Sequence, residues 1–356
     1  MTTVVDVARA AGVSKATAAR ALGGYGSVSP ATLERVRAAA DELGYSPNGL
    51  ARSMITGQTR SLGVVLADIE NPFFYGVLRG ITNTARAHAF DILLANTDED
   101  ATNERHALKT LAERRVEGLI LCPADGDDDD RSHVTSLLES GTPIVLVDRS
   151  IPGLNVDTVG LDNHRAAREA TQALIDRGHR RIALLTGGSP VHEATLRRPR
   201  MEGVERIPVT TLGARAAGFR DALLDAGIEP EPEYLTAGGF HRDDAEATTR
   251  ALMSLPTPPT AILASDSILS LGALLALRRL GLRIPDDVSL VGFDDAEWAE
   301  AVDPPVTVIR QPVNEIGVKS CELLLRRIAD PNLVAARHEL RGELVERGSI
   351  GPCPSR

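Results

Sequence analysis

The sequence predicts an α/β protein in which two doubly wound parallel sheets follow a small all-α N-terminal head. Two observations indicate the sheets. Short, nearly continuous apolar runs alternate with helix-like stretches, and this rhythm restarts once along the chain. A third observation indicates the head, because the first 45 residues carry three helical patterns. At 356 residues with 43% hydrophobic content, the chain is long enough to build more than one core.

Charge and cysteine content narrow the class of protein. Residues 1–60 hold seven basic and four acidic residues, a net charge of +3, while the remainder carries −13, giving −10 overall. A small basic head on an acidic body favours a head that contacts nucleic acid. The three cysteines stand alone, so we expect a reduced cytoplasm and neither a disulfide framework nor a cysteine-rich metal site. The N-terminus lacks a secretory signal, and no apolar run approaches the roughly 18 residues of a membrane span.

The first two helices of the head are separated as in a helix-turn-helix. Thr3 can cap a helix over about 4–11, and Gly12 supplies the backbone conformation that ends it. Ser14 can cap a second helix over about 15–22. The three or four intervening residues, including a glycine, match the turn of that motif.

A third helix begins at Ser29-Pro30, a capping residue followed by proline at the first helical position, and Gly44 ends it. Its predicted buried stripe is Leu33, Val36, Ala40 and Leu43. This pattern alone fits an ordinary three-helix bundle as well as a DNA-binding head. The second helix favours the latter, because it exposes small, basic and hydroxyl side chains that can enter a major groove. Those side chains are Lys15, Ala16, Thr17, Ala19 and Arg20.

Residues 61 onward contain the two sets of strands. The runs predicted as buried strands are SLGVVLAD, DILLAN, EGLILC and PIVLVD in the first set and RRIALLTGG, TAILAS and VSLVGF in the second. The predicted helices between them are 73–89, 103–115, 133–140, 215–226, 243–253 and 268–280. In doubly wound sheets, ligands bind beyond the carboxyl ends of the strands. Residues just after each run are therefore candidates for a binding site.

Those strand ends are rich in polar and aromatic side chains. The polar ones are Asp68, Asn71, Asp148, Arg149, Ser265, Asp266, Asp294 and Asp295. Aromatic residues make up only 3% of the chain, yet the following lie at or near strand ends: Phe73, Phe74, Phe240, Phe293 and Trp298. Carboxylates, guanidinium groups and flat apolar faces together suit a polyhydroxylated ligand. A single strand-end aspartate is more often a helix cap, but the set as a whole favours a binding cleft.

The sequence shows no metal-binding or catalytic motif with the required spacing. The acidic run Asp127–Asp130 lacks the spacing of a calcium-binding loop, so a solvated acidic loop is the favoured interpretation. The eight histidines stand singly, without metal-ligand spacing. No nucleophile elbow or phosphate-binding loop is present, so we predict no enzyme activity, no metal and no cofactor.

A family resemblance becomes specific at the N-terminus. DVARAAGVSKATAARAL, followed by VSPATLERVRAAADELGYSPNGLARSMITGQTRSLGVVL, resembles the N-terminal region of LacI/GalR-family transcriptional regulators. By position, the resemblance implies base contacts from Lys15 and Ala16. It places these residues at backbone-contacting or neighbouring positions: Val4, Ser14, Thr17, Arg20, Ser27 and Asn48. Ala18-Ala19 and Gly23 depart from the family's usual Val-Ser and asparagine, so the resemblance does not extend to the operator sequence.

The remainder is similar to the family's effector domain, which resembles periplasmic sugar-binding proteins. The effector-contacting positions implied by the resemblance are Phe73, Asp148, Arg149, Arg215, Phe240, Ser265 and Asp294. Arg215 lies in ARAAGF, which resembles the family's RxxGF motif. Residues 189–214 form a longer connection than is usual. We interpret them as an elaborated surface loop, with a reshaped pocket mouth as the alternative.

These observations predict four regions. Residues 1–45 form the DNA-binding head, and residues 46–60 form a hinge helix and linker. Residues 61–160 with about 312–341 form the N-terminal lobe of the core, and residues 161–311 with about 342–353 form the C-terminal lobe. We predict a cytoplasmic, ligand-responsive repressor that binds a near-palindromic operator as a homodimer, with a sugar or polyol as effector and no membrane partner.

Three alternatives remain open. The first is the same regulator with a purine, nucleoside or other non-sugar effector. The second is a solute-binding receptor, against which the basic head and the absence of a secretory signal argue. The third is an α/β enzyme acting on sugars, with Asp148 or Asp294 as general base, for which turnover of a bound sugar would be the supporting observation.

The hinge generates a testable prediction. SPNGLARSMITG (46–57) matches the family's hinge helix, which orders when two copies pack in the DNA minor groove, and this implies DNA contacts from Ala51 and Met54. Met54 stands where the family usually places a leucine that wedges between base pairs. Unstacking a base step costs a few kcal/mol, which the contacts of the bent DNA offset. Met54→Ala should therefore weaken specific binding far more than non-specific binding in titrations of both DNAs. An equal loss of affinity for specific and non-specific DNA would show that Met54 is a linker residue without a specific DNA contact.

Overall fold

The structure is a computed structural model. It describes residues 2–23, 25–45, 58–124, 131–188, 190–207, 210–237 and 239–355. The predicted hinge residues 46–57 and the acidic run 127–130 lie outside this range. The chain forms two compact units: Met1–Ser61 with Arg115–Glu117, and Leu62–Arg114 with Gly118–Arg356.

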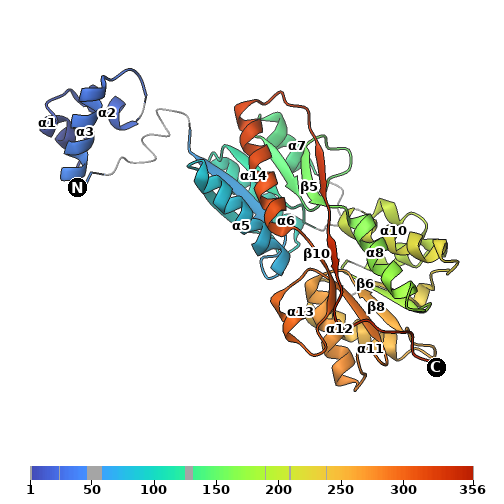
Figure 1. The fold of residues 1–356 in the computed structure, drawn as a ribbon. Helices are drawn as coiled ribbons and strands as arrows, with labels where there is room; N and C mark the ends of the chain where they lie inside the picture. The colour runs from blue at the N-terminus through green and yellow to red at the C-terminus, as the bar shows by residue number, and fades with distance from the viewer. Residues whose placement is uncertain are drawn as a thin grey trace. The chain divides into compact units, whose positions relative to one another are not determined.

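The first unit contains the three predicted helices, labelled in Figure 1: α1 (Val4–Ala10), α2 (Lys15–Gly23) and α3 (Pro30–Glu42). The capping interactions follow the sequence signals. The Thr3 amide donates to Asp6 Oδ2 at 3.0 Å, and Ser14 Oγ accepts the Thr17 amide at 3.1 Å. Gly12 has a φ of +63°, the left-handed conformation that lets the chain leave α1.

Small aliphatic side chains form the core of this unit. Val7, Ala18 and Val36, one from each helix, are fully buried at its centre. The predicted buried stripe of α3 is wrong at Leu43, which is 38% exposed. Leu43 follows the last helical residue, so it lies beyond the turn that packs against the other helices.

The second unit contains two six-stranded sheets, one in each lobe. The first-lobe strands, in spatial order, are β11 (Arg337–Leu340), β5 (Asp157–Leu161), β4 (Ile144–Val147), β3 (Gly118–Leu121), β1 (Ser61–Leu66) and β2 (Asp91–Asn96). The second-lobe strands are β12 (Glu343–Val345), β10 (Thr307–Arg310), β9 (Ser289–Phe293), β8 (Ala261–Ala264), β6 (Ile182–Thr186) and β7 (Leu235–Ala237). β12 pairs with β10 in antiparallel fashion, whereas β6, β8, β9 and β10 run parallel.

The apolar runs lie mainly at the centres of these sheets, as their continuous apolar character predicts. All residues of β3, β4 and β6 are buried. The prediction of burial is wrong for β2, whose side chains are exposed or half-buried, with Leu94 46% exposed. β2 lies at the end of its sheet beside β1, so it is covered less than the central strands.

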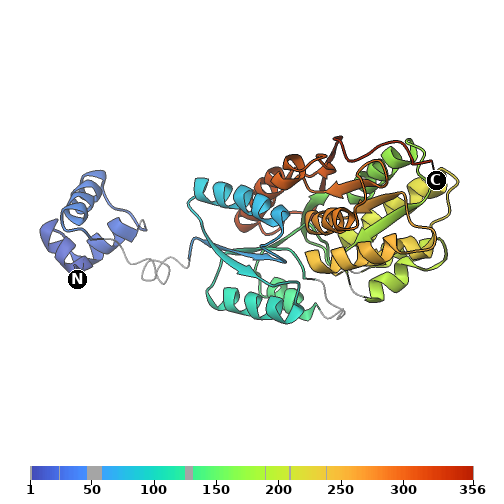
Figure 2. The ribbon, with the colours of Figure 1, turned by 90° about the horizontal axis from the view of Figure 1, so that it is seen from below.

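Helices cover both faces of the first-lobe sheet, as Figure 2 shows from below. Those of the first lobe are α5 (Pro72–Ala87), α6 (Ala101–Glu113), α7 (Ser132–Glu139) and α14 (Val313–Ala329). Those of the second are α8 (Asn163–Ile175), α9 (Pro190–Leu196), α10 (Thr210–Asp225), α11 (Arg242–Met253), α12 (Ser267–Arg279) and α13 (Glu297–Ala301). Among the described residues, every helix is too short or too polar to span a lipid bilayer.

The segment 189–214 is folded rather than a surface loop, so the favoured interpretation of it is wrong. It contains α9, the 3-10 turns Pro199–Met201 and Val204–Arg206, and the start of α10. Leu196, Met201 and Val204 are fully buried and belong to the core of the second lobe. Their burial in an apolar cluster explains why the longer connection folds onto the lobe.

The chain crosses between the lobes three times: from β5 to α8, from β10 to α14 and from β11 to β12. The Asp162 amide of the first crossing donates to the Leu340 carbonyl at 2.9 Å. A Cβ atom on Gly342 of the third crossing would lie 3.2 Å from the Arg310 carbonyl of the second. The three crossings therefore lie side by side, and Figure 1 shows β10 and the C-terminal segment running together between the lobes.

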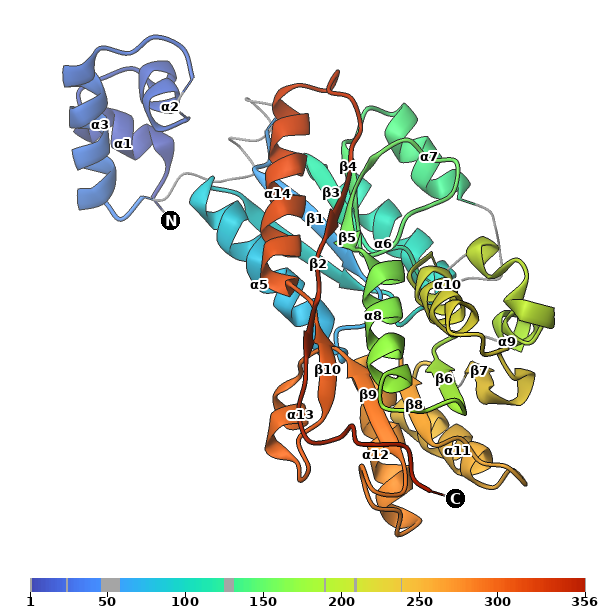
Figure 3. The same cartoon turned by 45° about the vertical axis from the view of Figure 1, so that its right-hand side comes forward.

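Glycines set the distance between neighbouring helices in the second unit. Figure 3 shows α5 beside α14 and α8 beside α10. A Cβ atom on Gly80 of α5 would collide with the Asn314 carbonyl, and one on Gly317 of α14 would collide with the Val77 carbonyl. Gly218 of α10 is equally close to the His164 carbonyl of α8. Because the obstructing atoms are backbone, these contacts leave no room for a side chain.

We predict that Gly317→Ala lowers the free energy of unfolding by about 1–3 kcal/mol, because the added methyl group must push α5 and α14 apart. Urea denaturation followed by circular dichroism measures the change. Glu322→Ala, on the exposed face of the same helix, is the matched control and should change stability by less than about 0.5 kcal/mol. Equal stability of Gly317→Ala and the native chain would show that the helices separate without cost.

Candidate DNA and effector sites

The predicted DNA-contacting residues of the first unit lie around the N-terminal turn of α2. Lys15, Ala16 and Arg20 are exposed on this helix, and Ser14 and Thr17 join their hydroxyl groups at 2.9 Å. Such a turn presents unpaired backbone N–H groups and the positive end of the helix dipole, which favour phosphate oxygens. Together these groups form a surface that can contact DNA.

Two further residues predicted to lie at or near the DNA backbone are outside the N-terminal turn of α2. Ser27 is exposed on the connection between α2 and α3, and Val4 is half-buried and packs against the core of the head. Asn48, Ala51 and Met54 lie outside the described residues.

A cavity lies between the two lobes, and all seven predicted effector residues line it. They are Phe73, Asp148 and Arg149 from the first lobe, and Arg215, Phe240, Ser265 and Asp294 from the second. Four residues noted as strand-end or neighbouring candidates also line it: Asp68, Asn71, Phe74 and Asp266. Six further residues line the cavity without having been predicted from the sequence: Glu99, Thr186, Gly187, Thr211, Leu212 and Gln311.

Part of the missed set had a sequence signal. Glu99 follows β2 and Gln311 follows β10, so both obey the strand-end rule. The run at β10 is only four residues long, so the sequence does not mark Gln311 as a strand-end residue. Thr211 and Leu212 belong to the first turn of α10, at the end of the folded segment 189–214, and no local pattern indicates them.

Asp148 and Asp294 occupy equivalent places in the two lobes. Each directly follows a buried strand and has a left-handed backbone, with φ of +66° and +65°. The Asp148 amide donates to the Val159 carbonyl at 2.8 Å, and the Asp294 amide donates to the Ile309 carbonyl at 2.9 Å. Aspartate tolerates this conformation better than most residues, and strained backbone clusters at ligand sites. Burial raises the pKa of both carboxyl groups.

Asp294 is held by two donors. Gln311 Nε2 donates to its Oδ1 at 2.6 Å, and the Ser267 amide donates to its Oδ2 at 3.3 Å. The other end of the Gln311 amide, Oε1, is buried and has no hydrogen-bond partner among the described residues. An unpaired buried acceptor costs free energy unless a ligand or water donates to it.

Arg215 is fixed from several sides. Its Nε donates to Asn163 Oδ1 at 2.7 Å, and its Nη1 donates to the Ser265 carbonyl. The guanidinium lies 4.3 Å from the centre of the Phe293 ring. Phe293 is fully buried and supports Arg215 from behind, so it is not among the residues that line the cavity.

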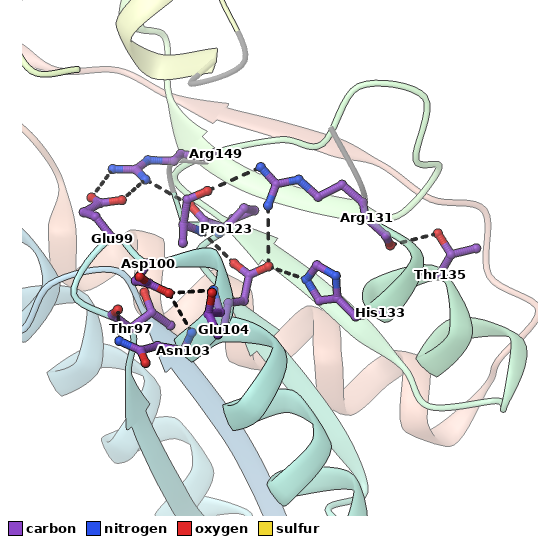
Figure 4. Close-up of polar contacts among 12 residues, drawn as sticks. Thr97, Glu99, Asp100, Asn103, Glu104, Pro123, Arg131, His133, Thr135 and Arg149 are labelled. Carbon is purple, nitrogen blue, oxygen red and sulfur yellow. Dashed lines mark hydrogen bonds and ion pairs between the residues drawn. The ribbon is translucent and has the colours of Figure 1, made fainter. Parts of the chain in front are cut away.

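Arg149 is paired with a carboxylate of its own lobe (Figure 4). Its Nη1 and Nη2 each donate to Glu99 at 2.6 Å, and Nη1 also donates to the Pro123 carbonyl at 3.0 Å. Burial alone would lower the pKa of Arg149, but Glu99 beside it raises that pKa well above its ordinary value. Arg149 therefore remains charged while both of its terminal nitrogens are occupied, whereas its buried Nε has no hydrogen-bond partner among the described residues.

Asp266 caps α12 at the cavity wall, its Oδ1 accepting the Leu269 amide at 2.8 Å. Burial, with the Asp294 carboxylate nearby, raises the pKa of Asp266 to about 7. This carboxyl group can therefore donate a proton in a hydrogen bond or accept one near neutral pH.

Aromatic rings complete the cavity wall. Phe73 and Phe74 pack edge to face with ring centres 5.1 Å apart. Phe240 lies against Gly187, where a Cβ atom would be 2.7 Å from its ring. The strand-end rule was wrong for Trp298, which packs against the core of the second lobe, and for Asp295, which pairs with Arg310 at 2.6 Å.

Comparisons with known proteins identify the family. Residues 3–48 match the family described as bacterial regulatory proteins, lacI family. Residues 59–343 match the periplasmic binding proteins and sugar binding domain of the LacI family. The chain belongs to the LacI family. This LacI-family protein is a DNA-binding transcriptional regulator with an effector-binding core.

Similar proteins cover this LacI-family chain over almost its whole length. The HTH-type transcriptional repressor CytR of Escherichia coli strain K12 is 32% identical over 356 residues, 99% of this chain and 97% of CytR. The CelR–cellobiose complex is 31% identical, with a TM-score of 0.71 over 98% of this chain and 100% of that one. The lac repressor dimer bound to operator and the anti-inducer ONPF is 25% identical, with a TM-score of 0.82 over 98% and 99%.

The cavity of this LacI-family core predicts a pH-dependent stability. Because folding raises the pKa of Asp266 from 3.8 to about 7, the folded state keeps a proton that the unfolded state loses. The contribution of Asp266 to the free energy of unfolding therefore falls as pH rises from about 4 to 7. Asp266→Asn keeps the cap but removes this titration. We expect it to gain stability relative to the native chain, on the order of 2 kcal/mol, between pH 5 and pH 8.

Thermal unfolding of both proteins at the two pH values measures the difference. Asp243→Asn, an exposed acidic residue on α11, is the control and should show no such trend. A stability difference between Asp266→Asn and the native chain that stays constant with pH would contradict the proposed protonation of Asp266.

Proposed function

We propose that the protein is a repressor that binds a near-palindromic operator as a homodimer and responds to a small polyhydroxylated effector, a sugar or polyol. The single observation that carries the effector assignment is the cavity between the lobes, lined by carboxylates, guanidinium groups and aromatic rings from both. Hydroxyl groups donate to carboxylates and accept from guanidinium groups, while the C–H face of a sugar packs on aromatic rings. The similarity to the CelR–cellobiose complex supports this ligand class.

For DNA recognition, we assign base contacts to Lys15 and Ala16 at the start of α2. Ser14, Thr17 and Arg20 contact the backbone near them, with Val4, Ser27 and Asn48 at neighbouring positions. The exposed hydroxyl and basic groups around this turn support the assignment. Two heads reading two half-sites require at least a dimer, and the similarity to the lac repressor dimer bound to operator supports that assembly.

The effector acts on the head through residues 46–60, the proposed hinge, in which Ala51 and Met54 contact DNA. The three crossings that lie side by side between the lobes permit a change in the angle between the lobes when the cavity fills. A coupling of about 1–3 kcal/mol between cavity and head changes operator affinity roughly 5–150-fold. This is the range over which a ligand can switch transcription.

A purine or nucleoside is the second candidate effector. The edge-to-face pair of Phe73 and Phe74 and the ring of Phe240 offer flat apolar surfaces on which a base can stack. A nucleoside also carries ribose hydroxyl groups, which the same carboxylates can bind.

The test is a thermal-shift screen of pentoses, hexoses, polyols and nucleosides with the full-length chain, repeated as operator-binding assays for each compound that stabilises it. We expect a sugar or polyol to raise the melting temperature and change operator affinity. If a purine stabilises the protein and no sugar or polyol does, the effector is a purine and the proposed sugar or polyol class is wrong. Sedimentation showing a stable monomer at operator-binding concentrations would count against the dimer.

We predict that Lys15→Ala lowers affinity for the operator about 10–100-fold, because a base contact in the major groove contributes about 1–3 kcal/mol of discrimination. Affinity for unrelated DNA should fall much less. Arg37→Ala, exposed on α3, removes the same charge from the same unit and is the matched control. Fluorescence anisotropy with operator and scrambled duplexes at one salt concentration measures both affinities. Equal effects of the two substitutions would place Lys15 outside the recognition surface.

A further inference from the structure

The charged groups that line the cavity are unevenly divided. Five carboxylates line it: Asp68, Glu99, Asp148, Asp266 and Asp294. The basic groups on the wall are Arg149 and Arg215. A carboxylate accepts hydrogen bonds and cannot donate when ionised, whereas a guanidinium only donates. The wall therefore offers many acceptors, and the character of the site depends on how many arginine donors remain available.

The two terminal nitrogens of Arg149, the fork of its guanidinium group, already donate to another side chain. Both terminal nitrogens donate to the two oxygens of Glu99 at 2.6 Å, in the parallel arrangement in which arginine also binds phosphate. The side chain is 9% exposed, and its Nε lies 3.7 Å from Asp148 Oδ2. An anionic ligand group that approached Arg149 would have to displace a carboxylate already in place.

Glu99 is held firmly on the first lobe. Its backbone amide donates to the Ala67 carbonyl at 2.9 Å. The next residue, Asp100, caps α6 by accepting the amides of Thr102 and Asn103 at 2.6 and 2.9 Å. The loop that carries Glu99 is therefore anchored on both sides of this residue.

The second acceptor of Arg149 is held as firmly, as Figure 4 shows. Pro123 is followed by Ala124, whose amide donates to Glu104 Oε2 at 2.6 Å. Glu104 is fully buried and lies 2.7 Å from His133 Nε2 and 3.6 Å from Arg131 Nη1. The Pro123 carbonyl is thus fixed by a buried cluster outside the cavity, and Arg149 cannot readily turn toward a ligand.

The opposite wall also favours a donating ligand. Arg215 already uses Nε and Nη1 on Asn163 and the Ser265 carbonyl. The buried Oε1 of Gln311 is an acceptor with no partner in the described part of the chain. This unpaired acceptor favours a ligand that brings N–H or O–H groups over one that brings anionic oxygens.

We propose that the cavity selects an uncharged ligand rich in hydroxyl or N–H donors, excludes phosphorylated and carboxylated forms of that ligand, and owes this selection to Glu99, which occupies the fork of Arg149. The inference rests on the proposed effector site and specifies its ligand class. Glu99 acts on specificity in two ways: it removes the donors that an anion needs, and it adds a negative charge that repels the anion.

The experiment is calorimetric titration of the full-length chain with matched pairs of compounds. The pairs are D-ribose with D-ribose 5-phosphate, D-glucose with D-glucose 6-phosphate and with D-gluconate, and cytidine with cytidine 5′-monophosphate. Within any pair that binds, we expect the anionic member to bind at least about 100-fold more weakly, a difference of about 2.8 kcal/mol. The same ratio is then measured in Glu99→Gln, which keeps the side-chain size but loses the charge and the paired acceptors.

In Glu99→Gln the ratio of affinities for the uncharged and anionic members of a pair should fall at least about tenfold. The two terminal nitrogens of Arg149 are then free to bind the phosphate or carboxylate. Asp98→Asn is the matched control, since Asp98 is exposed in the same loop outside the cavity wall. It should leave the ratio unchanged. Thermal unfolding checks that each variant is folded, and if Glu99→Gln is not, the ratio in the native chain alone decides the ligand class.

Three results would overturn the inference. Equal or tighter binding of an anionic member by the native chain refutes the exclusion and leaves the proposed regulator intact. If folded Glu99→Gln keeps the native ratio of affinities for the uncharged and anionic members of a pair, Glu99 does not cause the selection. The same conclusion follows if Asp98→Asn changes that ratio equally. Binding of neither member of any pair, with operator binding retained, refutes the proposed effector class itself and the inference with it.

Discussion

The arrangement of the core depends on the three chain crossings that run side by side between the lobes. Because the Asp162 amide is bonded to the Leu340 carbonyl and Gly342 packs on Arg310, the crossings form one compact strip. The carboxyl ends of both sheets face the cavity beside this strip, so the residues that follow β1, β4, β8, β9 and β10 include side chains at the cavity wall. The positions of Asp148, Ser265 and Asp294 follow from this constraint.

That position has an electrostatic consequence. Removing five carboxylates and two guanidinium groups from bulk water is unfavourable unless they are paired or change protonation. Both responses occur here. Arg149 is paired with Glu99, and Asp294 accepts from Gln311 and the Ser267 amide, while burial raises the pKa of Asp266 to about 7. The unpaired Oε1 of Gln311 is an acceptor that this network leaves for a ligand.

Local signals in the sequence were sufficient to predict the features of the structure that depend only on neighbours along the chain. Thr3, Ser14 and Ser29 predicted the starts of the three head helices, and Gly12 predicted the end of the first. They were insufficient where burial depends on the rest of the fold. β2 has the same apolar character as β3 but lies at a sheet edge, and the segment 189–214 has a loop-like composition but packs into a core.

The sequence by itself determined the order of helices and strands and the strand-end residues that meet in the cavity, because periodicity, caps and apolar runs are local properties. The family resemblance added Arg215, which lies within a helix. Only the tertiary structure decided the charge balance of the cavity. Glu99 and Arg149 are fifty residues apart and Gln311 lies far beyond both, so no local pattern predicts that all three line one cavity. Pairing across such separations depends on how the lobes fold, and it decides which arginine donors a ligand can reach.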